Sequence, residues 1–235
     1  FRVDLNNKSN TGASDFGKRV VRLANLGTTA AGVQITNGNQ PRFYQPPTVT
    51  IHDAGANTFI LVGIASGDRS TPLDVIPVQG REGMLPASAL TNRLDNNVYG
   101  IIDRDFIKKN LITGSPTLVS QDINLSTMVN KPQTITGNVV NTFFPTTGTG
   151  KNGWYRSLRS DYTGVDNINR EAGGLKAFEE EPIALKDNLF VPVYDPQGTG
   201  VDAKDSCSTR IVGESDRQQF CLPFGACINT DGILN

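Results

Sequence analysis

Short apolar runs separated by polar turn residues recur along the whole chain. Their length and their content of branched and aromatic residues predict β-strands. The predicted strands are Arg19–Ala24, Thr48–His52, Phe59–Ala65, Asn97–Ile102, Gln133–Val140, Gly153–Leu158, Leu189–Tyr194 and Thr209–Val212. Turn signals separate them, at Asn37-Gly38, Asp53-Ala54-Gly55, Gly148-Thr149-Gly150 and Gly198-Thr199-Gly200. Because runs such as Phe59–Ala65 are almost continuously apolar, we expect a packed sheet whose inner strands are covered on both faces.

The remaining pattern adds few helices and two long polar stretches. Pro86–Leu94 begins with proline, and Asp103–Leu111 has acidic residues early and lysines late, so each predicts a short helix. Leu26–Gln45 and Asp161–Glu181 predict insertions between strands. No fixed repeat period stands out, so a propeller of irregular blades and a sandwich both fit the pattern. We expect a single all-β domain over residues 1–235, because a chain of this length can enclose one core.

Charge is sparse and balanced. Charged residues make up 19% of the chain and the net charge is −1, which argues against a broad basic surface for nucleic acid or an anionic membrane. No apolar run approaches the roughly twenty residues of a membrane-spanning helix, and the N-terminal residues do not show the charged-then-apolar pattern of a leader. Because the chain starts without methionine inside the strand-like Phe1–Leu5, we expect it to be a piece of a longer protein.

The three cysteines all fall in the last thirty or so residues, as Cys207, Cys221 and Cys227. A hairpin of Thr209–Val212 with Arg217–Cys221, turning at Gly213-Glu214-Ser215-Asp216, would bring Cys207 close to Cys221. The short-loop pairing Cys221–Cys227 is equally open. Either disulfide indicates an oxidising compartment and leaves one cysteine to pair elsewhere or stay free, whereas buried reduced thiols are the alternative.

Motifs for catalysis are poorly formed. His52 is the only histidine and lies at a strand end beside Asp53, which is typical of a surface histidine. Gly63-Ile64-Ala65-Ser66-Gly67 resembles a nucleophile elbow, but its serine spacing is wrong. Gly148–Asn152 resembles a phosphate loop, but Pro145 replaces its first glycine and Asn152 its hydroxyl. We therefore expect a protein that binds rather than catalyses.

The sequence signals for a metal-binding site are equally weak. Asp103-Arg104-Asp105 and Asp195–Asp202 lack the alternating acidic pattern of calcium loops. Glu179–Glu181 before Pro182 reads as a solvated loop, and the cysteines with a remote histidine do not give zinc spacing. The sequence predicts no metal or cofactor within this chain.

Several segments, in order along the chain, together resemble one known family. They are Phe1-Arg2-Val3-Asp4-Leu5; Arg42-Phe43-Tyr44-Gln45-Pro46-Pro47; Val62–Leu73, with Gly63, Gly67, Arg69 and Pro72; Val98–Asp105, with Tyr99 and Asp103; and Gly153-Trp154-Tyr155-Arg156-Ser157-Leu158. This set is similar to the C-terminal β-propeller domain of the PilC/PilY family of type IV pilus tip-associated proteins. Physically, the glycines suit close packing, Pro46-Pro47 an extended approach to a strand, and Trp154 a large apolar anchor.

The resemblance implies a modified β-propeller, or part of one, with long loop insertions. It implies export to the cell surface, pilus tip or outer membrane, and roles in pilus biogenesis, adhesion, twitching motility and, in naturally competent bacteria, DNA uptake. The implied partners are minor pilins and a host-cell or surface receptor. The family's calcium loop lies just upstream of the strand that resembles Phe1–Leu5, so calcium is implied only for a longer protein.

Two other classes of function compete with this interpretation. A propeller dehydrogenase with a quinone cofactor would be recognised by cofactor absorbance. A carbohydrate-binding module would stack sugars on exposed aromatic residues such as Tyr155 or Tyr162 and would bind glycan arrays.

Overall fold

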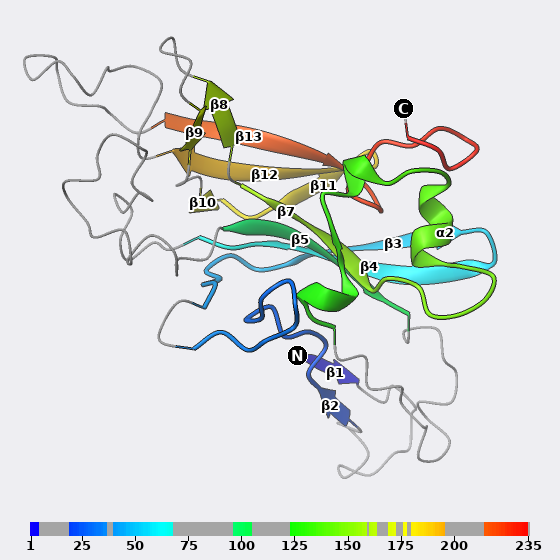
Figure 1. Cartoon of the computed structure of the whole chain (residues 1–235). Helices are drawn as coiled ribbons and strands as arrows, with labels where there is room; N and C mark the ends of the chain where they lie inside the picture. The colour runs from blue at the N-terminus through cyan, green and yellow to red at the C-terminus, as the bar shows by residue number, and fades with distance from the viewer. Residues whose placement is uncertain are drawn as a thin grey trace, which may run out of the picture.

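The computed structural model describes residues 1–4, 19–36, 40–67, 96–104, 123–158, 160–163, 169–172, 176–177, 180–195 and 214–234. Two larger sheets dominate these residues and pack as two layers (Figure 1). Neither sheet closes on itself among the described strands. The predicted all-β class is confirmed.

The first layer is a five-stranded sheet with the strand order β3-β4-β5-β7-β6. All neighbours are antiparallel except β6 and β7, which are parallel. The strands are β3 (Thr48–Ala54), β4 (Asn57–Ala65), β5 (Asn97–Asp103), β6 (Val129–Asn130) and β7 (Gly153–Ser157). Four of the predicted strands are thereby confirmed, and all seven residues of β5 are buried, as expected of an inner strand covered on both faces.

The second layer is built around β12 (Asn188–Asp195), which confirms the strand predicted there. β13 (Glu214–Cys221) pairs with β12 along its whole length. On the other side of β12 lie β10 (Lys176–Ala177) and β11 (Ile183–Leu185), which pair with different parts of that strand. Two small antiparallel pairs complete the strands, β1 (Arg2–Asp4) with β2 (Arg19–Val21) and β8 (Ser160–Thr163) with β9 (Asn169–Ala172).

Two-residue turns set the register of the main hairpins. Gly55, with φ of 62°, opens the turn between β3 and β4, the position that a type II′ turn reserves for glycine. Lys186 and Asp187, with φ of 46° and 61°, form the turn between β11 and β12; positive φ at both positions is the mark of a type I′ turn. The Asn188 side chain steadies this second turn by donating to the Lys186 carbonyl at 2.8 Å.

The strand predicted at Gln133–Val140 is wrong. The segment holds a 3₁₀ turn, η5 (Pro132–Thr134), and the start of a short helix, α2 (Val139–Phe143). Proline lies in the first turn of η5, where its missing N–H costs nothing. Asn138 caps α2 by accepting from the Asn141 N–H, which outweighs the strand preference of the valines. A second 3₁₀ turn, η4 (Leu125–Thr127), carries a capping box from Asn124.

Five further predictions need correction or fall outside the described residues. Asp103, predicted to start a helix, ends β5 instead; Pro86–Leu94 and Thr209–Val212 lie outside the described residues. Asp161–Glu181, predicted as an insertion, contains most of β8, all of β9 and β10. Glu214, Ser215 and Asp216, predicted as a turn, belong to β13 because they pair with β12.

The apolar core has two parts, one on each face of the five-stranded sheet. The inner face packs against β12 and β13. The largest fully buried side chains of this cluster include Trp154 and Phe59 from the sheet and Phe143 from α2. The outer face, with Tyr99, Ile101 and Tyr155, is covered by Leu23–Leu26 and by the Ile123–Met128 segment. Among the described residues no helix is long and apolar enough to cross a bilayer.

Candidate functional site

Trp154, from the Gly-Trp-Tyr segment, is fully buried between the two layers. Gly100 lies opposite on β5, where a Cβ atom would come within 2.7 Å of the indole Cζ2. The indole Nε1 donates a hydrogen bond of 2.8 Å to the Pro223 carbonyl, and Phe220 stacks 5.9 Å away. The tryptophan therefore joins the first sheet, the end of β13 and the segment that follows it.

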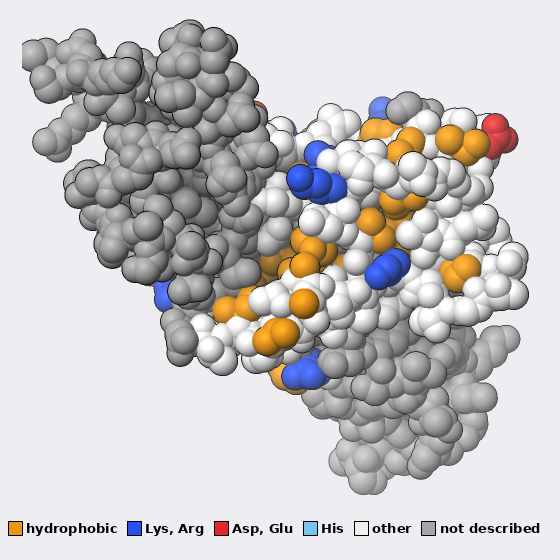
Figure 2. Space-filling view, in the orientation of Figure 1, with side chains coloured by type: hydrophobic (Ala, Val, Ile, Leu, Met, Phe, Trp, Pro, Cys, Tyr) orange, Lys and Arg blue, Asp and Glu red, His pale blue; other side chains and the backbone are white. Residues whose placement is uncertain are grey.

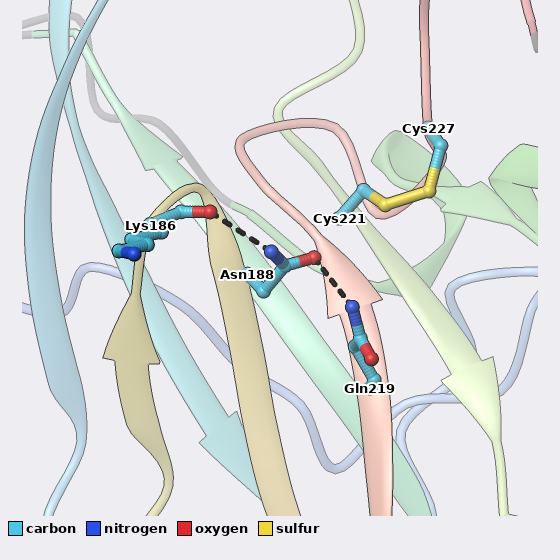
Figure 3. The surroundings of a disulfide bond; sticks show 5 residues. All are labelled: Lys186, Asn188, Gln219, Cys221 and Cys227. Carbon is cyan, nitrogen blue, oxygen red and sulfur yellow. Dashed lines mark hydrogen bonds between the residues drawn. A yellow bond between two sulfur atoms is a disulfide. The ribbon is translucent and has the colours of Figure 1, made fainter.

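A disulfide between Cys221 and Cys227 closes that segment into a short loop (Figure 3). Of the two pairings that the sequence left open, the structure has this one, and Cys207 lies outside the described residues. Inside the loop Phe224 is buried and stacks on Phe143 of α2 at 4.9 Å. The loop thus covers one end of the inner core.

The disulfide lies beside the turn between β11 and β12, as Figure 3 shows. The Asn188 side chain links this turn to β13, since its Nδ2 donates to the Lys186 carbonyl and its Oδ1 accepts from Gln219 Nε2 at 2.9 Å. Leu222 N–H also donates to the Asp187 carbonyl at 2.7 Å. The disulfide loop is therefore built onto the second sheet through direct hydrogen bonds.

Tyr99 is the centre of an aromatic row on the outer face. Phe43 lies 5.8 Å from its ring and Tyr155 lies 6.5 Å away. Its hydroxyl accepts from Asn97 Nδ2 at 3.3 Å, and burial raises the pKa of Tyr99 to about 12. Burial also raises the pKa of Tyr155. Since Tyr155 is 6% exposed, the interpretation of this residue as a platform for sugars is wrong; the Tyr162 side chain lies outside what the structure describes.

The Arg42–Pro47 segment crosses the outer face and leads into β3. Its aromatic residues are partly exposed, Phe43 at 36% and Tyr44 at 47%, whereas Gln45 is buried. The Arg42 carbonyl accepts from the Gly67 N–H at 3.0 Å. Pro46 and Pro47 are exposed and immediately precede β3. This segment of the resemblance therefore presents aromatic side chains to solvent.

The two glycines of the next segment lie at contacts between the layers. A Cβ atom at Gly63 would come within 3.1 Å of the Leu189 side chain, and one at Gly67 within 2.8 Å of the Ala177 backbone nitrogen. Backbone crowding at Gly67 is the harder constraint, because Ala177 also donates to the Ser66 carbonyl there. Arg69 and Pro72 fall outside the described residues.

Asp103 and Arg104 have structural partners at the end of β5. Asp103 is 2% exposed and both its carboxylate oxygens accept from Arg2. Arg104 donates to the carbonyls of Phe143 and Lys151 at 2.6 Å each, and burial lowers its pKa. The acidic group considered for calcium is thus engaged by an arginine. No group of three or more potential metal ligands occurs among the described residues.

His52 and Ser66 are separated by the fold. The His52 ring stacks on Phe59 and lies 2.8 Å from the Thr50 hydroxyl; burial lowers its pKa, opposed by Asp187 and Asp53. Since Phe59 faces His52 across the hairpin and Ser66 lies seven residues further along the chain, the two are about 20 Å apart. Ser66 is fully buried and bonded to Asn97, so the two do not form a hydrolase pair.

The solvent-exposed apolar residues of β3 and β11 were not singled out in the sequence. On β3, Val49 and Ile51 are 57% and 63% exposed, and on β11 Ile183 and Leu185 are 48% and 60% exposed. In the view of Figure 2 the described Lys and Arg side chains stand apart from one another, and apolar side chains gather between them. The alternation Thr48-Val49-Thr50-Ile51 was the signal that could have indicated a strand with one apolar face turned outward.

No family model, curated protein or solved structure matches this chain.

Proposed function

We propose that this chain is a non-catalytic assembly and adhesion region of an exported protein at the tip of type IV pili. The proposal starts from the resemblance of five segments to the PilC/PilY family. It is supported by one observation above the others: those segments, far apart in sequence, contact one another. Arg2 pairs with Asp103, and Phe43 packs on Tyr99, which neighbours Tyr155.

These contacts matter because unrelated, chance matches to a family pattern have no reason to meet in space. The Arg42 carbonyl accepts from Gly67, and Gly100 makes room for Trp154. The segments therefore form one connected structural unit. In the proposed fold, the two face-to-face sheets, antiparallel except for the β6–β7 pair, are blades of a modified propeller, because propeller blades are small antiparallel sheets that pack in this way.

The disulfide supports the proposed location outside the cytoplasm. Disulfides persist in the periplasm and on cell surfaces, and are reduced in the cytosol. Cys221–Cys227 joins the described core at its C-terminal end, so an exported protein is the consistent reading. The proposed partners are minor pilins at the pilus tip and a receptor on a host cell or another surface.

The test is surface pilus yield, measured by shearing and quantification in a strain whose protein lacks this region. Twitching and DNA uptake are scored on the same cells, with the complete protein restored as the control. We expect fewer surface pili and lost twitching, both recovered on restoration. Normal pili, motility and uptake would overturn the assembly role.

Two cheap measurements separate the alternatives. Absorbance of a quinone in the purified chain would favour the dehydrogenase. Saturable binding on a glycan array, lost in the Tyr44→Ala variant, would favour a carbohydrate-binding module, since Tyr44 is an exposed aromatic residue on the outer face.

A further inference from the structure

Strand β3 forms an edge of the five-stranded sheet. It pairs with β4 on one side, and no described strand pairs with it on the other. Strand β11 lies beneath it in the second layer, because the inward-facing Thr48 hydroxyl donates to the Pro182 carbonyl. The edge itself is therefore not occupied by β11.

The hairpin register decides which backbone groups face outward. The two-residue turn makes Ala54 and Asn57 the closing hydrogen-bonded pair. Hydrogen-bonded and non-hydrogen-bonded pairs then alternate along an antiparallel ladder. Val49, Ile51 and Asp53 fall in the non-hydrogen-bonded pairs, so their N–H and C=O groups point to the open edge.

The same three residues carry the exposed side chains of the strand. The burial of β3 alternates, with Val49, Ile51 and Asp53 exposed and the residues between them half-buried. Ile60 and Val62 lie opposite on β4 and extend the apolar surface inward. An open edge with branched apolar side chains is a template for another strand.

The other long edge strand is built differently. Among the described strands β13 pairs only with β12, and its exposed side chains are polar or charged: Ser215, Asp216, Arg217 and Gln219. Polar and charged side chains are a usual protection against edge-to-edge pairing. Polar side chains thus cover the exposed side of β13, whereas on β3 the only exposed charge is Asp53 and the other two exposed side chains are apolar.

The charge around β3 selects among possible occupants. Asp53 is exposed on the same face as Val49 and Ile51. Asp187 is near enough to His52 for its charge to oppose the lowering of the His52 pKa by burial. Exposed carboxylates outnumber the cations on these neighbouring elements, with Asp53, Glu180, Glu181 and Asp187 against Lys186 and Arg217. A second copy of the chain would bring two acidic edges together, whereas a basic segment would be attracted.

We propose that the β3 edge binds an extended segment of another protein by strand addition. In antiparallel pairing, the more stable arrangement, the partner residue opposite Asp53 is Lys or Arg. The residues two and four positions later lie opposite Ile51 and Val49, and are Val or Ile. The partner motif is therefore a basic residue followed by two branched apolar residues at alternate positions, with polar residues between them.

The inference does not depend on the pilus assignment, and its test is separate from pilus assays. The probe is the peptide acetyl-Lys-Thr-Val-Thr-Val-Thr-amide, titrated against the whole 235-residue chain by calorimetry. We expect saturable binding with a dissociation constant on the order of 10–100 µM, since peptide strands gain mainly backbone hydrogen bonds.

Matched peptides test the predicted register. N-methylation of both valines removes the donors that face β3, whereas N-methylation of the second and third threonines alters groups that point away. We expect at least tenfold weaker binding for the first and less than threefold for the second. Replacing the peptide lysine with glutamate should weaken binding at least fivefold.

Matched protein variants test the site. Ile51→Lys should weaken binding at least tenfold, while Ile183→Lys, an exposed position on the second layer, adds a cation off the edge and should weaken it less than threefold. Asp53→Lys should reverse the preference in favour of the glutamate peptide. All three positions are solvent-exposed, and circular dichroism with thermal melting checks that each variant stays folded.

Three results would overturn the proposal. The first is no saturable binding of the lysine peptide. The second is equal binding of the peptide with methylated valines. The third is a dimer of the chain in sedimentation that Ile51→Lys abolishes, because a second copy would then be the occupant.

Discussion

The two faces of strand β5 differ in what stabilises them. On the inner face Val98, Gly100 and Ile102 meet Trp154 and the second sheet in an apolar cluster. On the outer face Tyr99 and Asp103 lie among hydrogen-bonding partners, the Asn97 amide and the Arg2 guanidinium. One strand therefore joins a layer held by apolar burial to a layer that also depends on buried polar pairs.

Because of this difference, we expect substitutions and pH to change the stability of the two faces in different ways. Apolar burial depends on packing and is nearly independent of pH. A buried polar pair depends on both partners, and removing one leaves the other desolvated without compensation. The predictions below test this contrast, from the largest expected effect to the smallest.

Trp154→Ala should reduce the free energy of unfolding by about 4–5 kcal/mol, because it leaves a large cavity between the layers. The expected loss is the same at pH 7 and pH 9 in urea unfolding. Trp154→Phe retains a ring but loses the Pro223 hydrogen bond, and should cost about half as much. A loss below about 1 kcal/mol for the alanine variant would contradict the described core.

Asp103→Ala should cost about 3–4 kcal/mol, because the Arg2 guanidinium would remain buried without its carboxylate. The control is the double variant Arg2→Met with Asp103→Leu, which removes both charges and should recover most of the loss. Urea unfolding of the single and double variants measures the coupling between the two residues. Strictly additive losses would show that the pair is not coupled.

Alkaline pH should weaken the outer face through Tyr99. Its pKa is raised from 10.0 to about 12 in the folded protein, so the stabilisation is fully present below pH 10 and is lost as the pH rises through 12. Two pH units correspond to about 3 kcal/mol. Unfolding free energies measured across this window should fall, and the fall should shrink in Tyr99→Phe. An unchanged fall would assign it to other groups.

The disulfide should contribute least, about 2 kcal/mol, because the loop between Cys221 and Cys227 is short. The double variant Cys221→Ala with Cys227→Ala should lower the urea midpoint and shift the fluorescence of Trp154, which bonds to the loop. Cys207→Ser is the matched control and should leave both unchanged. A stability loss in the control alone would mean that Cys207 belongs to the stabilising disulfide.

Much of the framework was predictable from local pattern. Apolar runs predicted the strands at Thr48–His52, Phe59–Ala65, Asn97–Ile102 and Leu189–Tyr194, and each is present. The turn signal at Asp53-Ala54-Gly55 was also correct, since Gly55 takes the positive φ that the hairpin requires. These features depend on residues close together in sequence, so they can be predicted without knowledge of the fold.

Local pattern failed where partners far away in sequence decide. The valines near Gln133–Val140 favour strand, but a cap and a proline start short helical turns there. Glu214–Asp216 looked like a turn and became strand by pairing with β12. The same reason hid the burial of Tyr155, which depends on the segment covering the outer face.

The sequence by itself determined the all-β class, the positions of the main strands and the cysteines available for pairing. Only the tertiary structure decided that Cys221 bonds to Cys227, that Arg2 meets Asp103 and that Trp154 contacts Pro223. It also decided which edge strand presents apolar side chains to solvent. Periodicity reports which side of an element is apolar, but what covers that side is set by the packing of distant segments.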